Sequence, residues 1–348
     1  MFANSQTEHI SIKVGRQIIE FGRPALLVAE IGGNHGGDRV LAGKMLAAAA
    51  AGGAGAVKFQ AYRTSHFVSP RSPFYAELAA EELSFAALAD LAGQGRDLGL
   101  AVGLTVFDQA GLELAADCRA DFIKISSGDL TNHFLLGLAA ESGQPLFVST
   151  GASNEDELAE ALELLAPARE RLVLLQCASL YPAPPETANL ALVARWLGEG
   201  LAAGYSDHTL GLDASKMALS LGALVLEKHF TIDRTLPGGD NLISALPDEL
   251  AELARWSELV VSLWGSGRKA PHRQEEALRP LIRRVQSAAR DLPAGHRLEP
   301  DDLILLRPSS AGNFLEPKHA SACHGRVLAR SLSRGEALAW GDLESDCG

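Results

Sequence analysis

The stretch LAAGYSDHTLGLDASKMALSLGALVLEKH, residues 201–229, contains the pattern that decides the fold. Two short apolar runs at its ends, LAAGYSD and ALVLEKH, flank a longer helical pattern. An apolar strand, a helix and a second apolar strand in this order make a βα unit with parallel strands. Histidines stand at the ends of both runs, at His208 and His229, each beside a carboxylate.

The same alternation of short apolar runs and helical patterns extends from about residue 25 to about residue 265. Eight such units in about 240 residues fit a (β/α)8 TIM barrel better than a doubly wound open sheet. The predicted strands are 25–31, 55–60, 100–106, 121–126, 145–150, 172–178, 201–207 and 223–229, and the clearest helical segments are 38–51, 84–99, 154–166 and 246–264.

The segments on either side of the predicted barrel have patterns of their own. Residues 10–22, ISIKVGRQIIEFG, alternate like a β-hairpin that caps the bottom of the barrel. Near the other end, ARDLPAGHRLEPDDL at 289–303 repeats as ARSLSRGEALAWGDL at 329–343, and two copies indicate a small pseudo-symmetric domain rather than a solenoid. We predict a barrel domain over residues 1–268, a charged linker over 269–284 and a small domain over 285–348.

Composition limits the class of protein. The formal net charge of −12 argues against nucleic-acid binding, which needs a basic face. No apolar run reaches the roughly 18 residues of a membrane span, and the N-terminus shows no secretory signal, so we expect a cytoplasmic protein with no membrane contact. The cysteines form no CxxC pair, which argues against disulfides and a thiolate zinc site; they are Cys118, Cys177, Cys323 and Cys347.

Polar or ionisable residues end every predicted strand, whereas the earlier residues of each strand are apolar. The carboxyl ends of barrel strands meet at one face, where catalytic groups gather. Any one of these residues is more often a solvated loop residue, but Lys58 with Gln60, and Glu227 with His229, share a strand face. The set favours an active site, formed by Glu30, Lys58, Gln60, Thr105, Lys124, Ser127, Ser149, Ser179, Tyr181, His208, Glu227 and His229.

The two histidines are candidate metal ligands. A lone histidine beside an apolar run is more often structural, but His208 and His229 end neighbouring strands. Two imidazoles with open positions suit Mn²⁺, Co²⁺ or Zn²⁺, which would act as a Lewis acid on a carbonyl oxygen. Asp207 or Glu227 would then orient an imidazole or hold a metal-bound water.

Three cationic side chains, Lys58, Lys124 and Arg234, place positive charge on the same rim of an acidic protein, which would attract an anionic substrate. A lysine at a strand end is alternatively a Schiff-base nucleophile, which would make the protein a metal-independent aldolase. The glycine-rich GGNHGG at residues 32–37 lacks the GxGxxG spacing of a dinucleotide site, and a tight βα turn accounts for it.

Seven motifs in order, AEIGGNHGG, AVKFQAY, KISSGDLTN, FVSTGA, QCASLYPAP, GYSDHTLGLDAS and LEKHFTIDRTLPGGD, resemble the sialic acid synthase family over nearly the whole chain. The resemblance implies a TIM barrel followed by a small antifreeze-like (SAF) domain of β-clip type. It also implies condensation of phosphoenolpyruvate with an N-acyl hexosamine, with release of phosphate by C–O cleavage, to give a nonulosonic acid.

The resemblance also implies roles for individual residues. His208 and His229 match two ligands of a divalent metal ion, Mn²⁺ with Co²⁺ or Mg²⁺ as alternatives, and Arg307 matches an arginine that reaches the partner's barrel in a domain-swapped homodimer. Positions around phosphoenolpyruvate are matched by Lys58, Lys124, Ser127, Ser149 and Tyr181, and positions near the acceptor sugar or the metal-bound water by Glu30, Gln60, Thr105, Asp129, Glu227 and Asp240. Either Glu30 or Glu227 is expected to handle the water.

Departures from the family pattern concentrate on the acceptor side of the expected site. They are Asp129, Ala152, Ser179, Asn241 and the stretch PSSAGNF at residues 308–314. The acceptor therefore stays open among N-acetylmannosamine, mannose and a diacetamido-dideoxy hexose. The altered C-terminal stretch also leaves a non-catalytic sugar-binding module as an alternative.

Overall fold

The computed structural model describes residues 10–344. The chain divides into two compact units, Met1–Gly265 and Ser266–Gly348.

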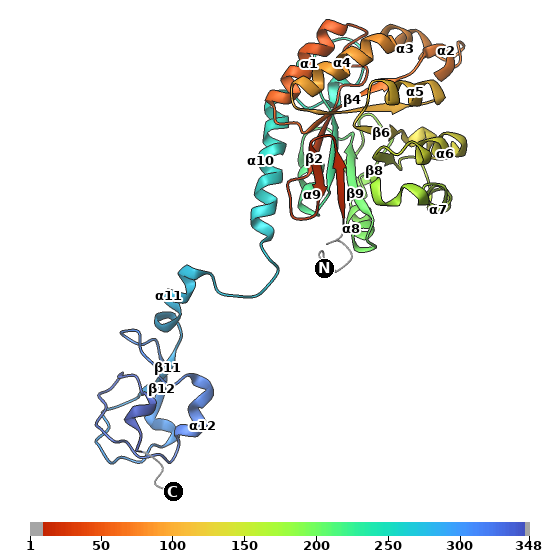
Figure 1. The fold of residues 1–348 in the computed structure, drawn as a ribbon. Coiled ribbons are helices and arrows are strands. Elements are labelled where there is room, and N and C mark those ends of the chain that lie inside the picture. Colours follow the sequence, from red (N-terminus) through yellow and green to blue (C-terminus); the bar gives the residue numbers. More distant parts are fainter. Residues whose placement is uncertain (1–9, 345–348) are drawn as a thin grey trace. The chain divides into compact units, whose positions relative to one another are not determined.

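Eight parallel strands of the first unit close into a barrel in the order β10-β3-β4-β5-β6-β7-β8-β9. Figure 1 shows these strands with the helices of the unit outside them. The predicted (β/α)8 barrel is therefore confirmed. The closing pair sets His229 on β10 beside Glu30 on β3. The strands are β3 Leu26–Glu30, β4 Ala56–Ala61, β5 Ala101–Val106, β6 Phe122–Ile125, β7 Leu146–Ser149, β8 Leu172–Cys177, β9 Ala202–Asp207 and β10 Val225–His229.

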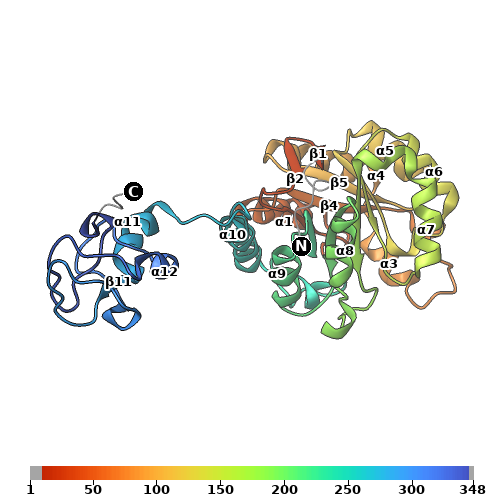
Figure 2. The same cartoon turned by 90° about the horizontal axis from the view of Figure 1, so that it is seen from below.

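Helices surround the strands, as the end-on view in Figure 2 shows. Local signals start them: Asp38 caps α1 through the amides of Val40 and Leu41, and Asn154 forms a capping box with Glu157 in α7. The helices of this unit are α1 Arg39–Ala51, α2 Thr64–Phe67, α3 Tyr75–Glu81, α4 Phe85–Asp97, α5 Gln109–Asp117, α6 His133–Glu141, α7 Glu155–Leu164, α8 Ala191–Gly198, α9 Asp213–Ser220 and α10 Pro247–Trp264.

Large and small side chains alternate on the inner face of the barrel and form a floor below its carboxyl end. The rings of Phe122 and Phe147 stack with centroids 4.3 Å apart. Gly103 makes room for them, because a Cβ there would overlap the Phe122 ring. Gly204 allows β9 to approach β10 closely, because a Cβ there would overlap the Val225 carbonyl. Polar residues one layer higher therefore sit on a packed floor, not over an open channel.

The predicted hairpin is formed by β1 Ser11–Val14 and β2 Gln17–Glu20, which pair antiparallel. Its turn residue Gly15 adopts φ +59°, and a Cβ there would lie 2.7 Å from Asp121 Oδ1. Asp121 comes directly before β6, so the hairpin covers the amino ends of the strands, as expected.

The second unit has a core of its own, built around Leu292, Leu298, Leu332 and Leu338. Its two repeats lie across from each other, with a backbone bridge between Leu292 and Leu332. The repeats are also equivalent in detail, because Arg290 pairs with Asp302 as Arg330 pairs with Asp342. Its elements are α11 Arg273–Ile282, which lies within the expected linker, β11 Val285–Ala288, β12 Leu303–Leu306 and α12 Ala320–Cys323.

Within residues 10–344, none of the helices has the length and hydropathy needed to cross a membrane. Cys118, Cys177 and Cys323 are free thiols, in agreement with the predicted lack of disulfides among them. Cys347 and the N-terminal residues 1–9, to which the signal-sequence prediction applies, lie outside the described residues.

Candidate active site

A cavity of about 640 Å³ lies at the carboxyl ends of the barrel strands. It brings together the predicted site residues of the barrel, with contributions from all eight strands or the loops that follow them. The predicted residues that line it are Glu30, Lys58, Gln60, Thr105, Lys124, Ser127, Asp129, Ser149, Ser179, Tyr181, His208, Glu227, His229 and Asp240.

Four buried charged side chains form the base of this cavity. Lys58 forms a short ion pair with Glu30, and its Nζ donates to Thr105 Oγ1 at 2.6 Å. Glu227 Oε1 lies 3.4 Å from Lys124 Nζ and 3.9 Å from Lys58 Nζ. Side chains on alternate residues of four strands thus converge because period-two alternation points them all inward.

Burial and mutual charge set the protonation of this cluster. Burial raises the pKa of Glu30 despite the opposing charge of Lys58, and the carboxylate of Glu227 adds to the rise. Burial would raise the pKa of Glu227 as well, but the ammonium groups of Lys124 and Lys58 lower it. Burial also lowers the pKa of Lys124, against the effect of Glu227. Of the two carboxyl groups, Glu30 therefore takes up a proton more readily, and Glu227 is the one whose ionised form is favoured.

The prediction that Arg234 adds positive charge to the rim of the cavity is wrong. Arg234 does not line the cavity, because it binds the Ser244 carbonyl oxygen and the carboxylate of Glu249 at the start of α10. Two lysines and four carboxyl groups, those of Glu30, Asp129, Glu227 and Asp240, line the cavity. An anion entering it would meet cations already paired with carboxylates.

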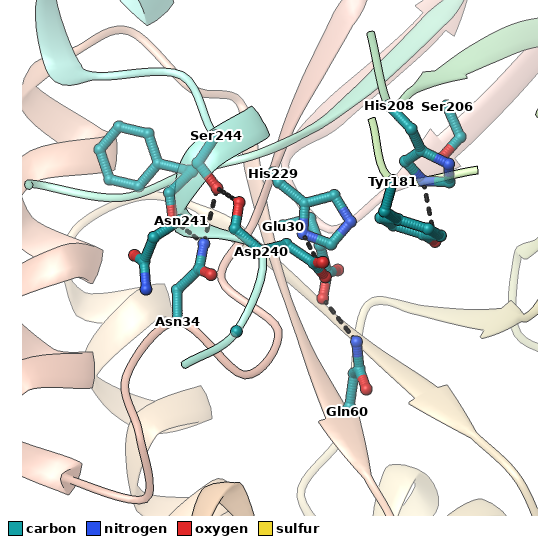
Figure 3. A network of polar contacts seen from close by, with 12 residues as sticks. Glu30, Asn34, Gln60, Tyr181, Ser206, His208, His229, Asp240, Asn241 and Ser244 are labelled. Atoms are coloured by element: carbon teal, nitrogen blue, oxygen red, sulfur yellow. Dashed lines mark hydrogen bonds and ion pairs between the residues drawn. The ribbon is translucent and has the colours of Figure 1, made fainter. Parts of the chain in front are cut away.

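The two predicted metal-ligand histidines line the cavity at the ends of the neighbouring strands β9 and β10, with ring centroids 5.4 Å apart. His208 Nδ1 contacts the Ala178 carbonyl oxygen at 2.7 Å, and its Nε2 lies 3.2 Å from the Tyr181 hydroxyl. His229 Nδ1 is buried without a hydrogen bond and lies 3.5 Å from Asp240 Oδ2. Figure 3 shows His229, Asp240 and Glu30 directed toward one another.

Asp207 does not orient either imidazole, contrary to one of the two expectations. Its position on β9 is one residue from both Ser206 and His208, which face the cavity, so Asp207 points to the outside of the barrel. There it accepts from Lys228 Nζ at 3.1 Å and from the hydroxyl of Ser215 on α9. The backbone carbonyl of Ala178 takes the orienting role instead.

The donor set fits a divalent metal ion. Burial lowers the pKa of His208, and burial together with the charges of His208 and Lys58 lowers that of His229, so both imidazoles favour the neutral form that binds metals. The Nδ1 atom of His229 is buried and makes no hydrogen bond with the protein, so it can coordinate a metal ion. Among the described residues no group of three or more His, Cys, Asp or Glu side chains is arranged to hold a metal ion, so the candidate donors here are the two imidazoles alone.

Hydroxyl groups line the opposite wall, near Lys124. Ser127 Oγ accepts from the Gly151 amide at 3.0 Å and lies 3.1 Å from Cys177 Sγ. Ser149 Oγ is buried on this wall without a hydrogen-bond partner, as is Glu227 Oε2 at the base of the cavity. Buried polar atoms are rarely left unpaired, so this wall is suited to bind a polar ligand.

Arg307 follows β12 in the second unit and is not among the lining residues. Several lining residues were not predicted. Ser206 and Cys177 each lie two positions before a predicted residue, so period-two alternation could have identified them. The lining residues on α2 and in the loops have no comparable periodic pattern in the sequence. The unpredicted lining residues are His66, Phe67, Phe107, Ser126, Gly128, Asn132, Cys177 and Ser206.

Comparisons with known proteins cover both units. A family model described as NeuB family matches residues 45–269, and one described as SAF domain matches residues 283–344. The N,N'-diacetyllegionaminic acid synthase of Legionella pneumophila is 35% identical over 92% of this chain and 94% of that protein. The N-acetylneuraminate-9-phosphate synthase of Mus musculus is 32% identical over 81% of this chain and 83% of that protein.

A solved structure gives the same result. The N-acetylneuraminic acid synthetase of Leptospira borgpetersenii, crystallised with citrate, superposes with a TM-score of 0.74 at 32% identity. The match covers 77% of this chain and 94% of that one.

Proposed function

The chain belongs to the NeuB family, and on that premise we propose that it condenses phosphoenolpyruvate with the open-chain aldehyde of an N-acylated hexosamine. The products would be a nonulosonic acid and inorganic phosphate. Relatives named as synthases of legionaminic and neuraminic acids support this reaction class. The observation that carries the proposal is the convergence of two lysines, two buried carboxyl groups and two imidazoles in one cavity.

Lys58 and Lys124 are the proposed partners of the phosphate and carboxylate of phosphoenolpyruvate. Because Glu30 holds a proton readily, it can release Lys58 to a ligand without leaving a buried carboxylate unpaired. The hydroxyls of Ser127 and Ser149 would donate to the same anion.

The proposed reaction forms one C–C bond and breaks one C–O bond. C3 of phosphoenolpyruvate attacks the aldehyde carbon, and protonated Glu30 gives its proton to the aldehyde oxygen. Water then adds to the cationic C2 and loses a proton to Glu227. The resulting tetrahedral centre expels phosphate and becomes the keto group of the product.

His208 and His229 would hold a divalent metal ion, Mn²⁺ with Co²⁺ or Mg²⁺ as alternatives. When bound there, it would supply Lewis-acid polarisation of the aldehyde carbonyl. Equilibrium dialysis tests this assignment: wild-type protein should bind about one Mn²⁺ per chain, as expected for a single site. His229→Ala should bind none, while His133→Ala, which changes an exposed histidine on α6, should bind like wild type.

One observation favours a second candidate, a Schiff-base aldolase. The lowered pKa of Lys124 would make its amine more nucleophilic at neutral pH. Borohydride reduction in the presence of a keto acid would trap a covalent adduct at Lys124 if this alternative holds, and would leave the protein mass unchanged for a phosphoenolpyruvate synthase.

A screen of acceptors tests the proposed function. Inorganic phosphate release from phosphoenolpyruvate should depend on N-acetylmannosamine, on mannose or on a diacetamido-dideoxy hexose, with Mn²⁺ present. The active acceptor would identify the sugar class. Acceptor binding without phosphate release would support the sugar-binding module instead.

A domain-swapped homodimer, in which Arg307 completes the partner's site, is part of the same proposal. Its support is the SAF domain match over residues 283–344, which contains Arg307.

A further inference from the structure

The loop between β10 and α10 carries Asp240 to its place beside His229, where the carboxylate lies 3.5 Å from Nδ1. Open space lies on both sides of this loop. Asp240 lines the cavity of about 640 Å³ and also a second one of about 370 Å³, whose other walls include Glu77, Glu81 and Gly239. Asp240 thus has open space on two sides, and hydrogen bonds to the backbone on either side of its side chain help to locate it.

The first of these contacts comes from Asn34, in the GGNHGG turn after β3. Its Nδ2 donates to the Phe230 carbonyl at 2.9 Å and to Ser244 Oγ at 2.7 Å. Ser244 Oγ in turn donates to the backbone carbonyl of Asp240 at 2.8 Å, as Figure 3 shows. Asn34 is 1% exposed, so this chain of hydrogen bonds is shielded from water.

The second contact comes from Glu81, the last residue of α3. Its Oε1 accepts from the Gly239 amide at 2.7 Å, directly before Asp240. The approach is possible only because glycines lie on both sides. A Cβ at Gly33 would overlap Glu81 Oε2, and Gly239 has φ +56° with Asn34 Oδ1 2.7 Å from its would-be Cβ.

We propose that Asn34 and Glu81 are positioning residues that hold the backbone on either side of Asp240 and so fix its carboxylate over the acceptor end of the active site. The inference rests on the proposed function for its kinetic consequence. The GGNHGG turn, which takes no part in the proposed reaction, has a structural role in this account. Asn34 and Glu81 connect the segments that follow β3, β4 and β10.

A double-mutant cycle tests the kinetic consequence. Glu81→Ala should lower kcat/KM for the acceptor by about 10-fold to 100-fold, the usual cost of misplacing a group in an active site, and leave KM for phosphoenolpyruvate within about twofold. In an Asp240→Ala background the same change should cost less than about twofold, because Glu81 acts through Asp240. Glu81→Gln keeps the accepting oxygen and should restore most of the acceptor kcat/KM.

Hydrogen exchange tests the clamp without turnover. The Gly239 amide should exchange at least about 10-fold faster in Glu81→Ala than in wild type, because its hydrogen bond is lost. Asn34→Ala should speed exchange across residues 238–244. Glu163→Ala is the control: it removes an exposed carboxylate on α7 that lines neither cavity, and should change neither exchange nor kinetics.

Two results would overturn the inference: equal losses from Glu81→Ala with and without Asp240, or unchanged exchange at Gly239. If wild-type protein releases no phosphate with any acceptor, the proposed function fails, and the exchange experiment still decides whether the clamp exists.

Discussion

Lys58 is held between two buried carboxyl groups, with its side chain only 4% exposed. An arrangement of this kind is stabilising only while it is complete, because a buried carboxyl group that loses its partner must either stay charged without one or take up a proton, and both cost free energy at neutral pH. A proton or a substrate anion that enters the cluster would therefore change the ion pairs between its lysines and carboxyl groups.

Lys58→Met is therefore expected to lower the free energy of unfolding by about 3–5 kcal/mol at pH 7. Glu30→Gln added to it should recover part of that loss, while activity stays absent. Urea unfolding measures both. Lys44→Met, which changes an exposed lysine on α1, serves as the control and should stay within about 0.5 kcal/mol of wild type. A loss below about 1 kcal/mol for Lys58→Met would contradict the cluster's assigned energetics.

His35 gives a pH-dependent prediction. It is 4% exposed, its Nδ1 accepts from the Gly37 amide at 3.0 Å, and burial lowers its pKa to about 4. Between an ordinary pKa of 6.5 and about 4, the unfolded chain binds the proton and the folded chain does not, so stability falls as pH falls through this window. The loss should approach about 3 kcal/mol at pH 4, at 1.36 kcal/mol per pKa unit.

His35→Asn keeps an acceptor for the Gly37 amide and removes the titration. Its unfolding free energy should fall less steeply than that of wild type between pH 6.5 and pH 4. Parallel curves for the two proteins would show that His35 is protonated in the folded state.

Period-two alternation along the strands was sufficient to predict most of the site at the residue scale. The prediction for Asp207 was wrong because it rested on proximity to His208 in the sequence and not on this alternation. Adjacent strand residues point to opposite faces, and Asp207 points outward. The prediction for Arg234 was also wrong, because Arg234 lies beyond the end of β10 in a loop, where no period applies.

The elements of the barrel follow the hydrophobic pattern closely. The predicted strand 223–229 appears as Val225–His229, and the predicted helix 246–264 appears as Pro247–Trp264. What the pattern did not reveal is how loops distant in the sequence interlock, as Asn34 and Glu81 do around Gly239. Such contacts depend on strand order around the barrel, which places β10, β3 and β4 side by side.

Two glycine-to-alanine substitutions distinguish a glycine required for close packing from one that only adds backbone flexibility. Gly204→Ala should destabilise the barrel by about 1–3 kcal/mol, because the new Cβ would press on the Val225 carbonyl of the next strand. Gly137→Ala, in the middle of α6 with open space around it, should stabilise by about 0.5–1 kcal/mol. Thermal unfolding measures both. Equal and small effects would contradict the close packing of β9 against β10.

For the molecule as a whole, the sequence repeat predicted the internal pairing of the second unit, and the two units have separate cores. The arrangement of subunits could not be predicted in the same way, because the sequence of one chain contains no pattern that shows where a side chain of a partner subunit lies. The proposed swap of Arg307 therefore needs a test with two chains.

Complementation between inactive variants is that test. Arg307→Ala and Lys124→Ala should each be inactive alone. Mixed, unfolded and refolded together, they should regain about one quarter of wild-type activity, since half of a random set of dimers is mixed and one of its two sites is intact. No recovery, with mixed dimers detected by mass, would show that Arg307 does not act across subunits.

The fate of the bridging oxygen of phosphoenolpyruvate tests the proposed chemistry most directly. With ¹⁸O in the C2–O–P position and the active acceptor sugar present, the released phosphate should carry the heavy isotope and the nine-carbon acid should not. Label retained in the acid, or phosphate released equally without any sugar, would contradict a condensation that proceeds by C–O cleavage.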